Sequence, residues 1–248
     1  MAMTRWVMRL ILANVVVYLL QQARPAITEM FAFVPVLVLA RPWTLLTYMF
    51  LHDPDSITHI LFNMLGLFFF GPRMEIELGG KNFLFLYFIS GIVAGLLSFF
   101  TPFTPIIGAS GAIFGVFMGF AYYWPRENIY IWGILPIQAR WMVVLMTALS
   151  LYGGLGFGMG NIAHFAHLGG FLGGYLFLKF LDRKAKIVDQ IVSSIPAVEP
   201  ARWKNIDRSK LHEVNRAELD RIQEKIKTTG VNSLNASERE FLERFSSM

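Results

Sequence analysis

Three groups of polar residues lie inside otherwise apolar stretches of this 248-residue chain, and their types could support nucleophilic chemistry. His59 and Asn63 are four residues apart, a spacing that places both on one face of a helix. Ser110 stands between glycines in Gly108-Ala-Ser-Gly111, and His167 follows in a later apolar stretch. A serine hydroxyl becomes an effective nucleophile when a histidine takes its proton, so this set is suited to acyl transfer.

Neighbouring residues could support such a pair. The tetrahedral intermediate of acyl transfer needs hydrogen-bond donors, which Asn63, His59 and the amide of Ser110 could supply. Glycine stripes let helix backbones approach closely, so contact between two stripes would bring Ser110 within reach of His167. With no carboxylate nearby, the expected unit is a dyad. One stripe follows the serine and the other follows the histidine: Gly111, Gly115 and Gly119, then Gly170 and Gly174.

The composition is typical of a membrane protein and excludes several other classes. The chain is 55% hydrophobic and 16% charged, with a mean hydropathy of +0.50, whereas soluble domains carry about 25% charged residues. A disordered chain would be far less apolar. The absence of cysteine removes disulfides, thiolate metal sites and a cysteine nucleophile. The net charge of +5 is better explained by membrane topology than by nucleic-acid binding, so no nucleic-acid partner is expected.

Six apolar segments approach or reach the length needed to cross about 30 Å of hydrocarbon. They predict an all-α, polytopic membrane fold with six transmembrane helices, over residues 6–22, 57–74, 82–100, 109–124, 141–157 and 162–181. The second, fourth and sixth segments then run in the same direction, and each begins near one of the polar groups. This topology brings the serine and the histidines to a similar depth.

Charge divides the chain into two predicted domains. Residues 1–181 hold 15 charged residues, and residues 182–248 hold 24. Seven basic residues of the first part fall on the side that carries the tail and two on the other side, which favours cytoplasmic N- and C-termini. We therefore predict a transmembrane domain over 1–181, then a charged linker (183–204) and a small cytoplasmic helical hairpin within 182–248.

The tail shows helix signals of its own. Apolar residues at helical spacing predict a helix that ends at Gly230: Leu219, Ile222 and Ile226. A second helix could begin at a capping pair formed by Asn235 and Glu238, or by Ser237 and Glu240. Both alternatives remain open at this point.

Three motifs on three segments together resemble the signatures of rhomboid intramembrane serine proteases. They are His-x-x-x-Asn at 59–63, Gly-x-Ser-Gly at 108–111 and Ala-His-x-x-Gly-x-x-x-Gly at 166–174. Their order, spacing and helix assignment all match, and the resemblance covers residues 5–181. The first loop departs from the Trp-Arg pair of many members, because Thr44 follows Trp43.

The resemblance implies a serine endopeptidase that cuts single-span transmembrane proteins, with no cofactor and no metal. Ser110 would be the nucleophile and His167 the general base. His59 and Asn63, with the amides of Ala109 and Ser110, would form the oxyanion hole.

The resemblance also implies supporting parts. Phe114 would hold its ring against the catalytic histidine, and segment 141–157 with the loop after it would form a lateral gate. The supporting glycines would be those beside the pair: Gly108, Gly111, Gly170 and Gly174. The expected partners are transmembrane substrates and membrane lipid, in a bacterial inner membrane, while the partner of the tail stays unknown.

Other readings of the same residues stay open. The chain could be a catalytically silent rhomboid-like protein that binds membrane clients, or a transporter or haem protein that uses its histidines. Silent members normally lack the serine or the histidine, and both are present here. His164 is a second histidine on its segment, but His167 has the matching glycines behind it. His52 is expected to face the outer interface and to shape a polar entrance.

Overall fold

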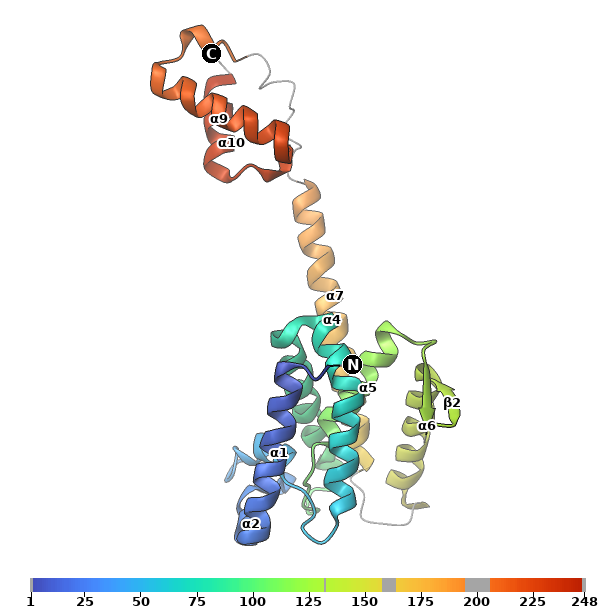
Figure 1. Cartoon of the computed structure of the whole chain (residues 1–248). Coiled ribbons are helices and arrows are strands. Elements are labelled where there is room, and N and C mark those ends of the chain that lie inside the picture. The colour runs from blue at the N-terminus through green and yellow to red at the C-terminus, as the bar shows by residue number, and fades with distance from the viewer. Residues whose placement is uncertain (1, 132, 158–163, 195–205, 247–248) are drawn as a thin grey trace. The chain divides into compact units, whose positions relative to one another are not determined.

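The computed structural model describes residues 2–131, 133–157, 164–194 and 206–246, and most of them are helical (Figure 1). Two compact units divide the chain, Met1–Ala185 and Lys186–Met248, which we call the membrane unit and the C-terminal unit. The first half of the membrane unit contains α1 (Arg5–Ala23), α2 (Ala26–Phe31), η1 (Pro35–Leu37), α3 (Thr44–Thr47), η2 (Tyr48–Phe50), α4 (Ile57–Leu97) and η3 (Ser98–Phe100).

The second half of the membrane unit begins with a short apolar helix. Its elements are α5 (Ser110–Tyr123), β1 (Asn128–Ile131), β2 (Leu135–Gln138), α6 (Ala139–Tyr152), the π-helical η4 (Gly153–Phe157) and α7 (His164–Ser194). The C-terminal unit contains η5 (Arg208–Lys210), α9 (Glu213–Thr229), η6 (Val231–Ser233) and α10 (Ala236–Ser246).

Helix α4 joins two segments that the sequence predicted as separate, 57–74 and 82–100. Pro72 lies inside it, and Gly79 adopts the non-helical values φ 73° and ψ 152°, so the helix is kinked at that glycine. The stretch Ile57–Phe100 has 44 residues, which is about 66 Å of helix at about 1.5 Å per residue. That length is about twice the hydrocarbon thickness of a bilayer, so the turn at Gly79 can divide it into two membrane-length halves.

Three described stretches are long and apolar enough to cross a membrane: Arg5–Ala23, Ile57–Phe100 and Ala139–Phe157. Ser110–Tyr123 is a shorter apolar helix, and nine of its 14 residues are buried. At 14 residues it is about 21 Å long, shorter than the hydrocarbon layer of about 30 Å. Helix α5 is therefore mostly packed inside the bundle and is too short to cross such a layer by itself.

Helix α1 is attached to α4 through a buried carboxylate. Glu75 accepts a hydrogen bond from the Thr4 hydroxyl at 2.5 Å and from the backbone N–H groups of Trp6 and Val7, each at 3.0 Å. The first N–H groups of a helix lack intrahelical partners, so this contact supplies them from another helix. A carboxylate at a helix N-terminus also interacts favourably with the helix dipole.

A two-stranded hairpin corrects the all-α prediction. Strands β1 and β2 pair antiparallel, with Asn128 opposite Gln138 and Ile131 opposite Leu135. Exposed and half-buried residues alternate along β1, and this period of two residues is typical of a strand and not of a helix. Gly133 in the connection adopts φ +71°, a conformation that glycine accepts without steric cost.

Helix α7 corrects the predicted linker. It continues to Ser194, across the first half of the predicted linker 183–204, and residues 195–205 lie outside the described part. The polar stretch after residue 181 contains good helix formers such as lysine and alanine, so a loss of hydrophobicity did not end the helix. The predicted start of this segment, at 162–163, also lies outside the described residues.

Candidate active site

A tight backbone turn places Ser110 at the first position of α5. Gly108 adopts φ +119°, and its N–H donates to the carbonyl of Tyr48 at 3.0 Å. A Cβ atom at Gly108 would lie 2.7 Å from Nε2 of His59, so a side chain there would be both strained and obstructed. The buried Ala109 follows as the N-cap, and Ser110 begins the helix.

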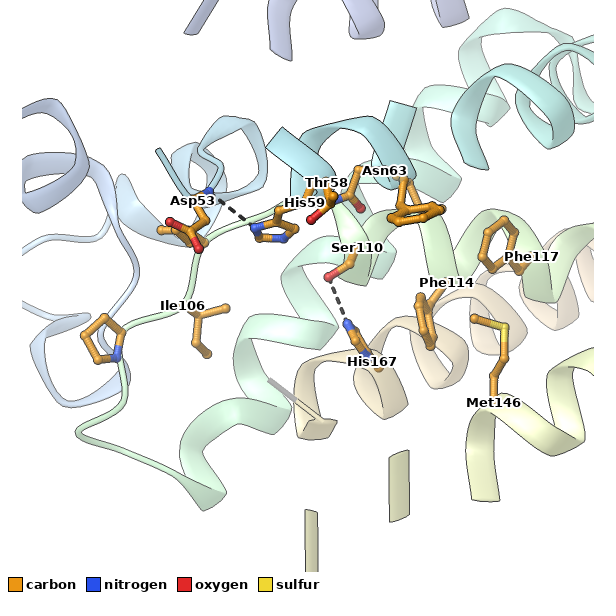
Figure 2. Close-up of a pocket in the computed structure, with 14 residues that line it drawn as sticks. Asp53, Thr58, His59, Asn63, Ile106, Ser110, Phe114, Phe117, Met146 and His167 are labelled. Atoms are coloured by element: carbon orange, nitrogen blue, oxygen red, sulfur yellow. Dashed lines mark hydrogen bonds between the residues drawn. The ribbon is translucent and has the colours of Figure 1, made fainter. Parts of the chain in front are cut away.

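The hydroxyl of Ser110 lies 3.0 Å from Nε2 of His167 (Figure 2). Glycines bring the two backbones together. A Cβ at Gly170 would lie 2.0 Å from the carbonyl oxygen of Gly111, and one at Gly174 would lie 2.8 Å from Cα of Gly115. The two stripes therefore face each other, and this contact places α5 and α7 at the separation that the serine–histidine hydrogen bond requires.

Aromatic stacking fixes the plane of the His167 ring. The Phe114 ring lies 4.1 Å from it, centroid to centroid, at an interplanar angle of 17°. Phe171 packs on Phe114 at 4.7 Å and holds it in place. His164 lies 6.5 Å from the His167 ring and packs over Gly153, where a Cβ would lie 2.1 Å from its Nε2. His164 thus joins the start of α7 to the end of α6.

A cavity of about 760 Å³ opens beside this pair (Figure 2). That volume lies in the range of sites that hold small molecules or short segments, about 300–1,000 Å³. Ser110, His167, His59 and Asn63 all line it, so the cavity brings together the polar groups of three helices. Much of the remaining lining is apolar: Phe62, Ile106, Ile107, Ile113, Phe114, Phe117 and Met146.

The Asn63 amide and the N-terminus of α5 lie on the serine side of the cavity. Asn63 is 6% exposed, and its side-chain amide donates to the carbonyl of His59 at 2.9 Å. One N–H of that amide is thereby used, and a carboxamide has two. The first N–H groups of α5 add a positive partial charge where Ser110 begins the helix. Chemically, the arrangement can activate a hydroxyl and stabilise an oxyanion next to it.

The structure places His52 differently from the prediction. It was expected to face the outer interface, but its side chain is fully buried, packed edge-on against His59 with the centroids 5.1 Å apart. Gln21 holds its backbone, accepting from the His52 N–H and donating to its carbonyl, each at 2.9 Å. Burial, and after it the neighbouring His59, lowers the pKa of His52 to about 3, so the ring is neutral at physiological pH.

The sequence analysis assigned neither Tyr48 nor Asp53 to the site. Tyr48 donates its hydroxyl to the carbonyl of Gly91 at 2.6 Å, and its own carbonyl accepts from Gly108. Asp53 lines the cavity, and its backbone N–H donates to Nδ1 of His59 at 3.3 Å. Asp53 precedes His59 by six residues and lies in a connection between two elements, so sequence patterning had no means of finding it.

Long apolar helices packed around a serine–histidine pair are typical of an integral membrane protein with a candidate hydrolytic site. A family model described as the rhomboid domain matches residues 39–184, and the chain belongs to the rhomboid family. A second model, described as a family of unknown function (DUF6576), matches residues 206–248.

Curated relatives agree with this family. The chain is 38% identical to RHOMBOID-like protein 4 of Arabidopsis thaliana over 136 residues, which are 54% of this chain and 32% of that protein. It is 37% identical to the rhomboid protease GluP of Bacillus subtilis (strain 168) over 134 residues, or 54% of this chain and 25% of GluP. The match therefore spans about a third of the first relative and a quarter of the second.

Proposed function

We propose that the chain is an intramembrane serine endopeptidase that cuts single-span transmembrane proteins through a Ser110–His167 dyad. The observation that carries the proposal is the 3.0 Å contact between the serine hydroxyl and Nε2 of the histidine, at the edge of a cavity. Membership of a family whose relatives include a named protease supports the same activity.

The proposed reaction runs in two halves. Ser110 Oγ attacks the carbonyl carbon of the scissile peptide while its proton passes to Nε2 of His167. His167 then gives that proton to the leaving amine as the C–N bond breaks, which leaves an acyl-enzyme on Ser110. Water hydrolyses the ester, with His167 taking a proton from the water and returning it to Ser110.

The oxyanion of each tetrahedral intermediate would be stabilised by His59, Asn63 and the amides of Ala109 and Ser110. Removing one donor of such a set typically reduces turnover by about 10²–10³-fold. Because other donors remain, Asn63→Ala should reduce turnover by about 10–10³-fold without complete loss. Unchanged turnover in Asn63→Ala would remove Asn63 from this assignment.

The proposed topology has six spans with both termini in the cytoplasm of a bacterium, in its inner membrane. The turn at Gly79 would divide α4 into two of these spans. Residues 1–181 would form the protease domain and 182–248 an accessory cytoplasmic tail. The chain has no cysteine, so single cysteines introduced into an otherwise unchanged protein can report which side each loop occupies.

Substrates would enter the cavity past α6, which would act as the lateral gate. Of the apolar window in the stretch Ala139–Phe157, 17% is buried, against 44% for Ile57–Phe100. A helix with little packing against its neighbours moves at low cost. Met146 of α6 lines the cavity, so displacement of this helix would open the cavity toward lipid.

Labelling with a fluorophosphonate probe tests the proposal directly. Wild type, Ser110→Ala, His167→Ala and Ser90→Ala would be compared in detergent, because Ser90 is a buried serine that does not line the cavity. We expect labelling of wild type and Ser90→Ala and none of the other two. Cleavage of a single-span substrate in bilayers should follow the same order.

The outcomes separate the protease from its silent alternative. Labelling that persists in Ser110→Ala would show that another residue reacts and would overturn the dyad. Folded wild type that neither labels nor cleaves in bilayers would overturn the protease and favour the catalytically silent alternative.

A further inference from the structure

The cavity beside Ser110 carries a carboxylate that the proposed reaction does not use. Asp53 lies in the connection between η2 and α4 and lines the same cavity as Ser110 and His59. Figure 2 shows it beside His59, above Ile106. Among the described residues that line the cavity, only Asp53 has a carboxylate, and none has an ammonium or guanidinium group.

Asp53 is held through both its side chain and its backbone. Its Oδ1 accepts from the backbone N–H of Asp55 at 3.1 Å, and its backbone N–H donates to Nδ1 of His59 at 3.3 Å. The preceding residue, His52, is buried and fixed through Gln21. The position of the charge is therefore set by the folded loop and does not depend on a bound ligand.

Asp53 forms no ion pair among the described residues. The one ion pair in the described part of the membrane unit joins Arg73 and Glu127. A carboxylate that is half-buried at the wall of an apolar cavity interacts more strongly with a cation than one in open water, since the local dielectric is lower. Lysine and arginine suit such a position, because their long apolar stems can cross the apolar lining while the charged end reaches the carboxylate.

We propose that Asp53 is a specificity-determining residue that selects substrates with a lysine or arginine close to the scissile bond. This inference rests on the proposed function. In the proposed topology Asp53 lies at the outer end of α4, and basic residues are depleted on that side of membrane proteins. A basic residue there therefore distinguishes a minority of single-span proteins, and an acidic residue in the same place would be repelled.

The test uses one single-span substrate in bilayers with lysine, glutamine or glutamate placed in turn at each position within five residues of the cut. For wild type, we expect at least one position where the lysine substrate has a kcat/KM about tenfold above glutamine, and glutamate falls about tenfold below it. A tenfold ratio corresponds to about 1.4 kcal/mol. The difference should appear mainly in KM, since the contact forms on binding, and should shrink at high salt.

Charge replacement identifies Asp53 as the source. In Asp53→Asn the ratio of lysine to glutamine substrate should fall to about one, while the amide oxygen can still accept from the Asp55 N–H. In Asp53→Lys the order should reverse, with glutamate preferred. Reversal cannot come from misfolding, which would slow all three substrates together.

Asp55→Asn is the matched control. Asp55 is an exposed carboxylate two residues away that does not line the cavity. This variant should keep the wild-type preference for lysine.

Failure of the inference and failure of the proposed function look different. If wild type labels with fluorophosphonate and cleaves all three substrates equally, the Asp53 inference is overturned and the protease stands. A preference that survives in Asp53→Lys also overturns it. If wild type neither labels nor cleaves any substrate, the proposed function falls and the inference falls with it.

Discussion

The membrane unit and the C-terminal unit bury their interiors by opposite means. In the membrane unit glycines bring backbones into contact, as where Gly170 meets Gly111 and Gly174 meets Gly115. The C-terminal unit has a small apolar core with Ile222 and Leu242 fully buried. Lipid gives helices little hydrophobic reason to associate, so close packing must hold them, whereas water drives apolar side chains together.

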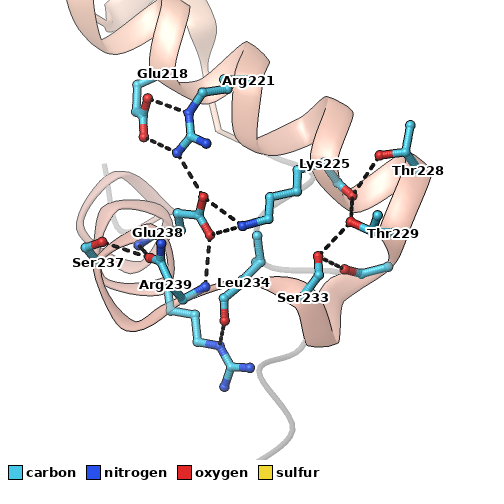
Figure 3. A network of polar contacts seen from close by, with 12 residues as sticks. Glu218, Arg221, Lys225, Thr228, Thr229, Ser233, Leu234, Ser237, Glu238 and Arg239 are labelled. Atoms are coloured by element: carbon cyan, nitrogen blue, oxygen red, sulfur yellow. Dashed lines mark hydrogen bonds and ion pairs between the residues drawn. The ribbon is translucent and has the colours of Figure 1, made fainter.

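Their buried polar groups differ in the same way. In the membrane unit the buried groups pair with the backbone: the Tyr48 hydroxyl and Asn63 amide donate to carbonyls, and the Glu75 carboxylate accepts from N–H groups. In the C-terminal unit the 3%-exposed Glu238 carboxylate accepts from Arg221 and Lys225 (Figure 3). The comparison implies that an added carbon damages one unit most, while a removed carbon or charge damages the other.

The largest expected effect is that of Gly170→Ala. The added Cβ would lie 2.0 Å from the carbonyl oxygen of Gly111, which is backbone and cannot rotate away. Helices α5 and α7 must then separate, and a displacement of about 1 Å at a catalytic pair costs about 100-fold in rate. We expect at least about 100-fold slower fluorophosphonate labelling.

Gly154→Ala is the control for that change, because its Cβ would meet its nearest atom at 3.4 Å, an ordinary contact. Labelling of Gly170→Ala at the wild-type rate would show that the backbone contact does not set the separation of the pair.

Ile222→Ala should unfold the C-terminal unit and leave labelling of Ser110 unchanged. Truncating a buried isoleucine costs about 2–5 kcal/mol, and a core this small rarely supplies more than about 3–5 kcal/mol. Hydrogen exchange of residues 206–246 in the full chain should accelerate throughout. Val214→Ala, at a side chain 72% exposed, is the matched control and should leave exchange as it is. Wild-type protection in Ile222→Ala would mean that this core does not hold the unit together.

Acid should weaken the C-terminal unit through Glu238. The Lys225 ammonium, the Asn235 N–H and the Arg221 guanidinium lower the pKa of Glu238 to about 2, from an ordinary 4.5. Between these values the unfolded chain binds the proton and the folded one does not. The contribution of this carboxylate is therefore complete above pH 4.5 and is lost as pH falls toward 2.

Amide NMR signals of residues 206–246 in the full chain would follow this loss during an acid titration. Glu238→Gln cannot ionise, so its stability should vary less across the same window. An identical acid profile for wild type and Glu238→Gln would assign the acid sensitivity to other carboxylates.

The smallest effect should come from Asp220→Asn. Asp220 lies 2.5 Å from Arg208, but these side chains are 47% and 64% exposed. Exposed ion pairs contribute about 0.2–1 kcal/mol, so a short distance alone does not make this pair important. The same exchange measurement should change by less than about 1 kcal/mol in local opening free energy. A larger loss would mean that surface pairs, and not the apolar core, stabilise this unit.

The spacing of apolar residues along the sequence predicted where helices occur more successfully than it predicted where each helix ends. The capping alternatives of the tail are resolved by the structure: Asn235 accepts from the Glu238 N–H and Glu238 accepts from the Asn235 N–H, each at 2.9 Å. Gly230, with φ 82°, ends α9 as its sequence position indicated. The extension of α7 to Ser194 was missed, because a helix that leaves an apolar environment has no hydrophobic pattern to follow.

The residues of the candidate site also fall into two groups, those that sequence spacing predicted and those that it did not. Spacing on one helix placed His59 and Asn63 together, and glycine stripes indicated that Ser110 and His167 could approach. Contacts with loops left no such pattern, which is why neither the burial of His52 nor its backbone contact with Gln21, 31 residues earlier, was predictable. Asp53 is in the cavity for the same reason, since the fold of its loop and not its sequence spacing puts it there.

The carboxylate that caps α1 also bears on how the protein is made. Glu75 is 68 residues downstream of Val7, whose N–H it accepts. At about 5–20 residues per second, a ribosome needs several seconds to add that interval. Until then the first helix has no carboxylate for its leading amides, and its attachment to the bundle is incomplete. The order of synthesis thus delays the attachment of the first helix until a residue well inside α4 has been made.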